Sequence, residues 1–223
     1  MAQIAEELFL LLVDNASGEP GLDDTRRGHA LAAATLLDMA YSCRVRPAVD
    51  GEPVAPGRLV ALDATGPVDP LTVSALDYLR KAPRRPGQAI NVLSRSVERE
   101  LVEHLERTGQ IRRVTVRSGA LRRRTHTPPT DRRRVGPARD ALLAALFERR
   151  PPTAATAAII TVLHAADGLG ALLSLNDRGW RWVHARAGEI AGGSWLDESP
   201  TGLAEVNLAV TASAVRQALA ELT

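Results

Sequence analysis

The feature that most constrains the fold is a helix-length segment, residues 25–42, that is apolar on most of its sides. Its large and small apolar positions are Leu31, Ala34, Leu36, Leu37 and Ala40. A helix that is apolar around most of its circumference must be surrounded by other elements. Aromatic residues make up only 3% of the chain, so the core must be built from Leu, Ala, Val and Ile, which suits packed helices. We therefore expect a mainly α fold with this helix at its centre.

Cap and stop residues predict where several helices begin and end. Asp23 or Asp24 is suited to cap the central helix, and Thr153 and Asn176 are suited to cap two later ones. Gly109 is a good stop for a strongly charged helix before it. The other helices are predicted at residues 4–13, 71–81, 91–108, 137–149, 153–167, 176–190 and 205–222.

A small amount of β structure is expected near the middle of the chain. Short strands are predicted at residues 44–46 and 58–62, and residues 111–117 and 121–126 are predicted to form a hairpin around Ser118 and Gly119. The predicted architecture is a single globular helical domain, residues 1–223, with a small β-hairpin insertion. The basic β-hairpin and its connector occupy residues 111–134 of that domain.

Three features of the sequence bear on location. The chain has no apolar run of about 18 residues, so no transmembrane helix is expected. Glu6 and Glu7 precede the first apolar stretch, which is not the pattern of a signal peptide. Cys43 is the only cysteine, which excludes an internal disulfide and fits a reducing compartment. We expect a cytoplasmic protein.

Positive charge is concentrated in one segment. Residues 112–150 hold twelve Arg against Asp131, Asp140 and Glu148, a balance of +9, which leaves −7 for the rest of a chain of net charge +2. Such a concentration needs a counter-charge, either a phosphate-rich surface or an acidic partner. Alternatively, the segment is a solvated charged loop. The arginines are Arg112, Arg113, Arg117, Arg122, Arg123 and Arg124 in the hairpin, followed by Arg132, Arg133 and Arg134 in the connector.

Three phrases in fixed order point to a known family. They are ALAAATLLDMAYSCRV at residues 30–45, ATGPVDPLTVSALDYL at residues 64–79 and VERELVEHLERTGQI at residues 97–111. Together they resemble the Golgi phosphoprotein 3 family over nearly the whole chain. In that family an alanine-leucine helix ends in a small residue plus Arg, a Pro/Thr-Gly-Asp-like turn opens a second helix, and an Arg-rich helix ends in Leu-x-x-x-Gly-x-Ile/Leu.

The resemblance implies a membrane adaptor that reads phosphoinositides, lies peripheral to the cytoplasmic membrane face and is not an enzyme. The family binds phosphatidylinositol 4-phosphate through a Trp ahead of the alanine-rich helix, an Arg within it and two Arg on the later helix. Here the Trp position falls near residues 22–24, which hold no aromatic, and the helix Arg position falls near Ala33. The later pair falls at Arg95 and Glu98, so one arginine of that pair is kept. The candidate headgroup-binding residues are Arg95, Arg26, Arg27 and Arg99.

In the resembled family the hairpin promotes self-association and has a more hydrophobic tip. Leu121 is the only sizeable apolar residue at this tip, so electrostatic adsorption to an anionic membrane is favoured over insertion. The expected partners are therefore an anionic phospholipid membrane, a second copy of the chain through the hairpin, and a protein cargo.

The sequence gives no reason to expect an enzyme. The five histidines are scattered without metal-ligand spacing, and there is no nucleophile elbow or dinucleotide fingerprint. We expect no catalytic residues, no metal and no cofactor.

Two binding alternatives remain. The first is a nucleic-acid-binding protein that uses the hairpin as a wing beside the helix at residues 91–108. Nucleic acid is the less favoured partner because that helix carries glutamates that repel DNA, at positions 98, 100, 103 and 106. The second alternative is an interaction module whose basic hairpin docks an acidic protein patch.

Overall fold

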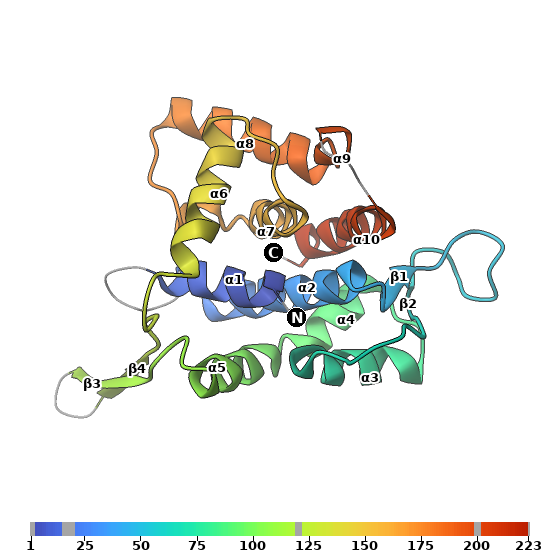
Figure 1. The fold of residues 1–223 in the computed structure, drawn as a ribbon, viewed down its shortest axis with the longest axis horizontal. Helices are drawn as coiled ribbons and strands as arrows, with labels where there is room; N and C mark the ends of the chain where they lie inside the picture. Colours follow the sequence, from blue (N-terminus) through green and yellow to red (C-terminus); the bar gives the residue numbers. More distant parts are fainter. Residues whose placement is uncertain (1–2, 15–20, 119–121, 199–201, 223) are drawn as a thin grey trace.

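The computed structural model describes residues 3–14, 21–118, 122–198 and 202–222 (Figure 1). Its α-helices are α1 Gln3–Val13, α2 Asp24–Tyr41, α3 Val73–Lys81, α4 Pro86–Leu93, α5 Val97–Arg107, α6 Val135–Phe147, α7 Ala154–Ala165, α8 Asp177–Ala191, α9 Trp195–Glu198 and α10 Leu203–Ala220. Two 3-10 helices are Pro70–Thr72, η1, and Leu169–Ala171, η2. The strands β1 Val45–Pro47 and β2 Leu59–Ala61 form one antiparallel pair, and β3 Val114–Ser118 and β4 Arg122–His126 form another. The prediction of a mainly α fold with a small β-hairpin is confirmed.

Helix α2 lies at the centre, as the sequence predicts. Every residue from Gly28 to Ala40 is buried, and the helix contacts α1, α4, α5, α7 and α10. In Figure 1, α4 and α5 lie below α2, and α7 and α10 lie above it. Asp23 caps the helix, because its carboxylate accepts the backbone N–H groups of Thr25 and Arg26 at 3.1 and 3.0 Å. The small side chains of this helix let neighbours pack against it from all sides.

Arg44 joins the end of α2 to the turn before α3. Its guanidinium is buried and donates to the backbone carbonyls of Ala64, Gly66 and Pro67 at 3.2, 2.8 and 3.0 Å. After this turn, Asp69 caps η1 by accepting the N–H of Leu71 at 3.0 Å. The first two sequence phrases are thus in direct contact, which explains why an arginine follows the alanine-rich helix.

The predicted single helix at residues 91–108 is wrong, because the structure has α4 and α5 with a turn at residues 94–96 between them. Two causes act at this turn. The Ser94 hydroxyl donates to the Asn91 carbonyl oxygen at 3.1 Å and competes with helical bonding. Gly28 of α2 also approaches closely, since a Cβ atom there would come within 3.2 Å of the Ser94 carbonyl oxygen. Gly109 ends α5 with φ +71°, as predicted.

The second half of the chain forms the layer above α2. Thr153 and Asn176 cap α7 and α8 as expected, through bonds from the N–H groups of Thr156 and Gly179. Helix α9 is four residues long and was not anticipated, because so short a segment carries no measurable apolar period. Among the helices described, none is both long and apolar enough to cross a membrane.

The β3–β4 hairpin projects from the molecule beyond α5 (Figure 1). Its register pairs Val114 with His126 and Arg117 with Arg123. Pairing continues at the base, where the N–H of Arg112 donates to the Pro128 carbonyl oxygen at 3.2 Å. The predicted tip residues 119–121 lie outside the described part of the chain.

Candidate functional site

The close contact between Gly28 and Ser94 brings the first turn of α2 beside the start of α5. This junction holds the four arginines predicted to bind a lipid headgroup. Arg26 and Arg27 lie in the first turn of α2, Arg95 lies in the turn before α5, and Arg99 lies in the first turn of α5. The structure therefore gathers residues that are about 70 positions apart in the sequence.

Arg27 is committed to internal contacts. Its side chain is 11% exposed, and its Nε donates to Glu98 Oε1 at 2.8 Å. Its other two nitrogens donate to the Leu22 carbonyl oxygen at 2.9 Å and to Asp24 at 3.0 Å. A headgroup would bind Arg27 only by displacing these acceptors. Glu98, which stands where the resembled family has its second arginine, thus serves as the carboxylate partner of α2.

The side chain of Arg26 is half-exposed, and its acidic neighbours contact only part of its guanidinium group. Its Nε donates to Asp23 at 2.5 Å, and Asp167 lies 3.8 Å away. The hydrogen bond from Arg26 lowers the pKa of the Asp23 carboxyl group. One edge of the guanidinium therefore faces acids, and both partners remain open to solvent.

Arg95 and Arg99 differ from both residues of α2. Each side chain is exposed, and neither forms an ion pair with any residue that the structure describes. The buried face of α5 is formed by Val97, Leu101 and Leu105, so Arg99 lies on the outward side of the helix. Two free guanidinium groups are thus presented to solvent at one end of α5.

The basic hairpin divides into three parts. Arg112 is exposed, and Arg113 pairs with Glu106 of α5 at 3.0 Å. Four further predicted residues lie in the strands, but their side chains fall outside the described part of the structure; they are Arg117, Arg122, Arg123 and Arg124. The third part is the connector, residues 127–134, two of whose arginines form ion pairs with acids elsewhere in the fold.

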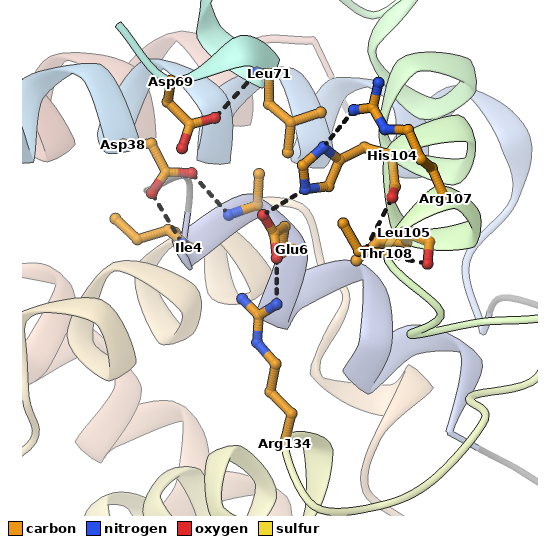
Figure 2. A network of polar contacts seen from close by, with 11 residues as sticks. Ile4, Glu6, Asp38, Asp69, Leu71, His104, Leu105, Arg107, Thr108 and Arg134 are labelled. Carbon is orange, nitrogen blue, oxygen red and sulfur yellow. Dashed lines mark hydrogen bonds and ion pairs between the residues drawn. The ribbon is translucent and has the colours of Figure 1, made fainter. Parts of the chain in front are cut away.

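Acidic residues in α1 and directly after it hold the connector and helix α6 through ion pairs. Arg132 and Arg139 both donate to Asp14, at 2.7 and 3.2 Å, and Arg134 pairs with Glu6 (Figure 2). Sequence analysis missed these pairs, although Glu6 stands out as a charged residue in an apolar helix. Part of the positive charge of this segment is therefore neutralised inside the fold.

The network in Figure 2 continues to the start of α1. His104 Nε2 lies 3.5 Å from Glu6 Oε1. Asp38 accepts the N–H groups of Ile4 and Ala5, both at 2.9 Å, and so holds the N-terminus of α1. Burial raises the pKa of Asp38 to about 7, against the opposing effect of these two bonds. The network links α1, α2 and α5 and ties the start of α1 to its neighbours.

Within the described residues, no group of three or more His, Cys, Asp or Glu side chains is placed to hold a metal ion. The arginines at the α2–α5 junction are the functional candidates that the structure brings together. A guanidinium presents a planar set of donors that binds phosphate oxygens in pairs.

Comparison with known proteins identifies the family. Curated protein sequences give no match to this chain. The family described as Golgi phosphoprotein 3 (GPP34) matches residues 4–222, nearly the full length. The chain therefore belongs to the Golgi phosphoprotein 3 family.

Proposed function

We propose that this protein is a peripheral membrane adaptor that binds anionic phospholipid headgroups, phosphoinositides in particular, through Arg95 and Arg99. The observation that carries the proposal is that these two arginines are exposed and form no ion pair with a described residue, beside the half-exposed Arg26. Membership of the Golgi phosphoprotein 3 family fits an adaptor of this kind.

The binding is built from several weak contributions. A basic residue near an anionic membrane contributes about 1 kcal/mol, and a single arginine fork holds one phosphate. The hairpin arginines, such as Arg112, add attraction without headgroup selectivity. Association of copies through the hairpin multiplies these contacts by raising the effective concentration. In this proposal the protein works without catalysis or a cofactor, at the cytoplasmic face of a membrane, and carries a protein cargo.

The test is liposome flotation at low and physiological salt, with neutral, generically anionic and phosphatidylinositol 4-phosphate vesicles. The variant replaces Arg95 and Arg99 by Ala. The matched control replaces Arg178 and Arg181, which are also exposed and belong to α8, a helix on the opposite side of α2 from α5 (Figure 1). We expect the first pair to weaken phosphoinositide binding at physiological salt by about tenfold and the control pair to leave it nearly unchanged.

Two results would count against the proposal. Equal losses in the two double variants would mean that only overall charge matters. Liposome binding that shows no headgroup preference and is abolished by duplex DNA would instead favour the nucleic-acid alternative, because the phosphate backbone of DNA would then compete for the same arginines.

A further inference from the structure

A second group of polar side chains lies on the other side of α2, in a cavity between α7 and α10. The cavity has a volume of about 500 Å³. Its polar lining residues are His164 at the end of α7, Ser213, Arg216 and Gln217 of α10, and Glu221 directly after α10. Arg216 and Gln217 follow Ser213 by three and four positions, and Glu221 follows Gln217 by four, which directs them to the same side of the helix.

Two buried nitrogen atoms in this group lack partners. His164 Nδ1 and Arg216 Nε are both shielded from solvent, and neither has a hydrogen-bond partner among the atoms described. Arg216 also forms no ion pair within the described structure. Buried polar nitrogens without partners are costly to a fold, so their presence in a cavity wall indicates a site completed by something from outside.

His164 lies beside two other basic side chains, His184 and Arg216. Its ring lies 5.6 Å from that of His184 on α8, which in turn stacks 5.5 Å from Trp180. Burial lowers the pKa of His164, and His184 and Arg216 lower it further, while Asp167 at the end of α7 opposes them. An anion in the cavity would oppose these effects and favour the protonated form of His164.

Glu221 is the opposing charge at this site, and further arginines line the neighbouring cavity. A second cavity of about 420 Å³ lies on the neighbouring side of α10 and shares Gln217 and Glu221 with the first. Arg58 and Arg85 line this second cavity. Among the described residues, the two cavities together are lined by three arginines, Arg58, Arg85 and Arg216, and by the single carboxylate of Glu221.

We infer that the cavity between α7 and α10 binds a phosphate-type oxyanion through Arg216 and His164, with Ser213 and Gln217 as further donors. The four donor side chains suit the three or more oxygens of a phosphate monoester, and the fork of Arg216 is able to hold two of these oxygens. A cavity of this size holds a small phosphorylated molecule.

This site is independent of the proposed membrane site. The cavity lies on the α7–α10 side of α2, and Arg95 and Arg99 lie on the α5 side (Figure 1). The oxyanion could belong to a soluble phosphate ester or to a lipid headgroup, and the experiment separates the two sources.

The experiment is an NMR titration of the full chain with inorganic phosphate, using chloride at equal ionic strength as the control. The chain has five histidines, and His164→Gln assigns the ring signal of interest. We expect phosphate to shift the His164 signal and raise its apparent pKa, and chloride to do neither. Arg216→Gln should weaken phosphate binding by about tenfold, and Glu221→Gln should strengthen it by about threefold.

Arg181→Gln on α8 is the matched charge control and should leave phosphate binding unchanged. The inference is overturned by a His164 signal that responds equally to phosphate and chloride, by equal losses in Arg216→Gln and Arg181→Gln, or by weaker binding in Glu221→Gln. The wild-type titration and Glu221→Gln decide the matter even where Arg216→Gln fails to fold. Liposome flotation of Arg216→Gln then separates the two sources of the oxyanion. Unchanged liposome binding indicates a soluble phosphate ester, and a loss of liposome binding alongside the loss of phosphate binding indicates a lipid headgroup.

Discussion

The arginines of the connector and those at the start of α5 look alike in sequence but differ in what they contact. Arg134 and Arg132 reach across the molecule to Glu6 and Asp14 of the N-terminal segment. Arg95 and Arg99 are exposed and reach no described acid. An arginine with a fixed acidic partner supports the fold, and one without a partner remains available for an outside anion. A basic run therefore does not by itself mark a binding surface.

The same contrast appears within two adjacent residues. Arg133 is 92% exposed and lies 3.9 Å from Asp131, whereas Arg134 is 31% exposed and pairs with Glu6, which is 9% exposed. Exposed pairs contribute little to stability, because solvent screens them and holding two long side chains in place costs entropy. Breaking a pair that includes a buried carboxylate is more costly, because the remaining charge loses its partner.

The largest expected effect is on Arg134. Arg134→Ala should lower the free energy of unfolding by about 2 kcal/mol, because it leaves Glu6 buried with only His104 nearby. Arg133→Ala should change it by less than about 0.5 kcal/mol. Urea denaturation of the two single variants measures both values.

A double variant gives the control for that prediction. Adding Glu6→Gln to Arg134→Ala removes the stranded charge and should restore part of the lost stability, which gives a coupling energy between the two positions. Equal effects of Arg133→Ala and Arg134→Ala would show that the connector is not docked on α1 through this pair.

Asp38 extends the comparison to a buried acid without an arginine. Its pKa is raised to about 7 in the fold by burial, above its ordinary value of 3.8. The protonated form is therefore favoured by folding, so its stabilising contribution is complete below the ordinary pKa and is lost as the pH rises through about 7. Between these values the free energy of unfolding should fall by up to about 1.4 kcal/mol per pH unit.

Asp38→Asn removes this titration and should flatten the dependence on pH between about 4 and 7. Denaturation at several pH values compares it with Asp77→Asn, which alters an exposed acid paired with Arg80 at 3.6 Å. A wild-type stability that does not fall over this range would show that the carboxylate is ionised at little cost while it holds the N-terminus of α1.

Contacts between residues close in the sequence were predicted correctly, and contacts between residues far apart in the sequence were not predicted. Asp23, Thr153 and Asn176 were predicted as caps because each cap bonds to residues two or three positions away. The turn at residues 94–96 depends on the approach of Gly28, which no local pattern reveals. The mainly α class was predictable from the sequence, because it follows from the apolar composition of α2, which is a property of one continuous segment.

The candidate site shows the same division. Arg27 was grouped with Arg95 because both are arginines near a family position, but its partner Glu98 lies 71 positions along the chain. Sequence alone does not show which arginines are already neutralised by such partners. The exposed and the paired members of the set become distinct only when α2 and α5 pack together.

The smallest expected effect on stability belongs to the double variant Arg95→Ala, Arg99→Ala. Because neither side chain contacts a described acid, the free energy of unfolding should change by less than about 0.5 kcal/mol. Arg27→Ala, which leaves Glu98 without its partner, should lower it by about 2 kcal/mol under the same denaturation conditions. A double variant that is as unstable as Arg27→Ala would place Arg95 and Arg99 among the arginines that support the fold. A stable double variant that loses lipid binding would instead separate the two roles within a single helix junction.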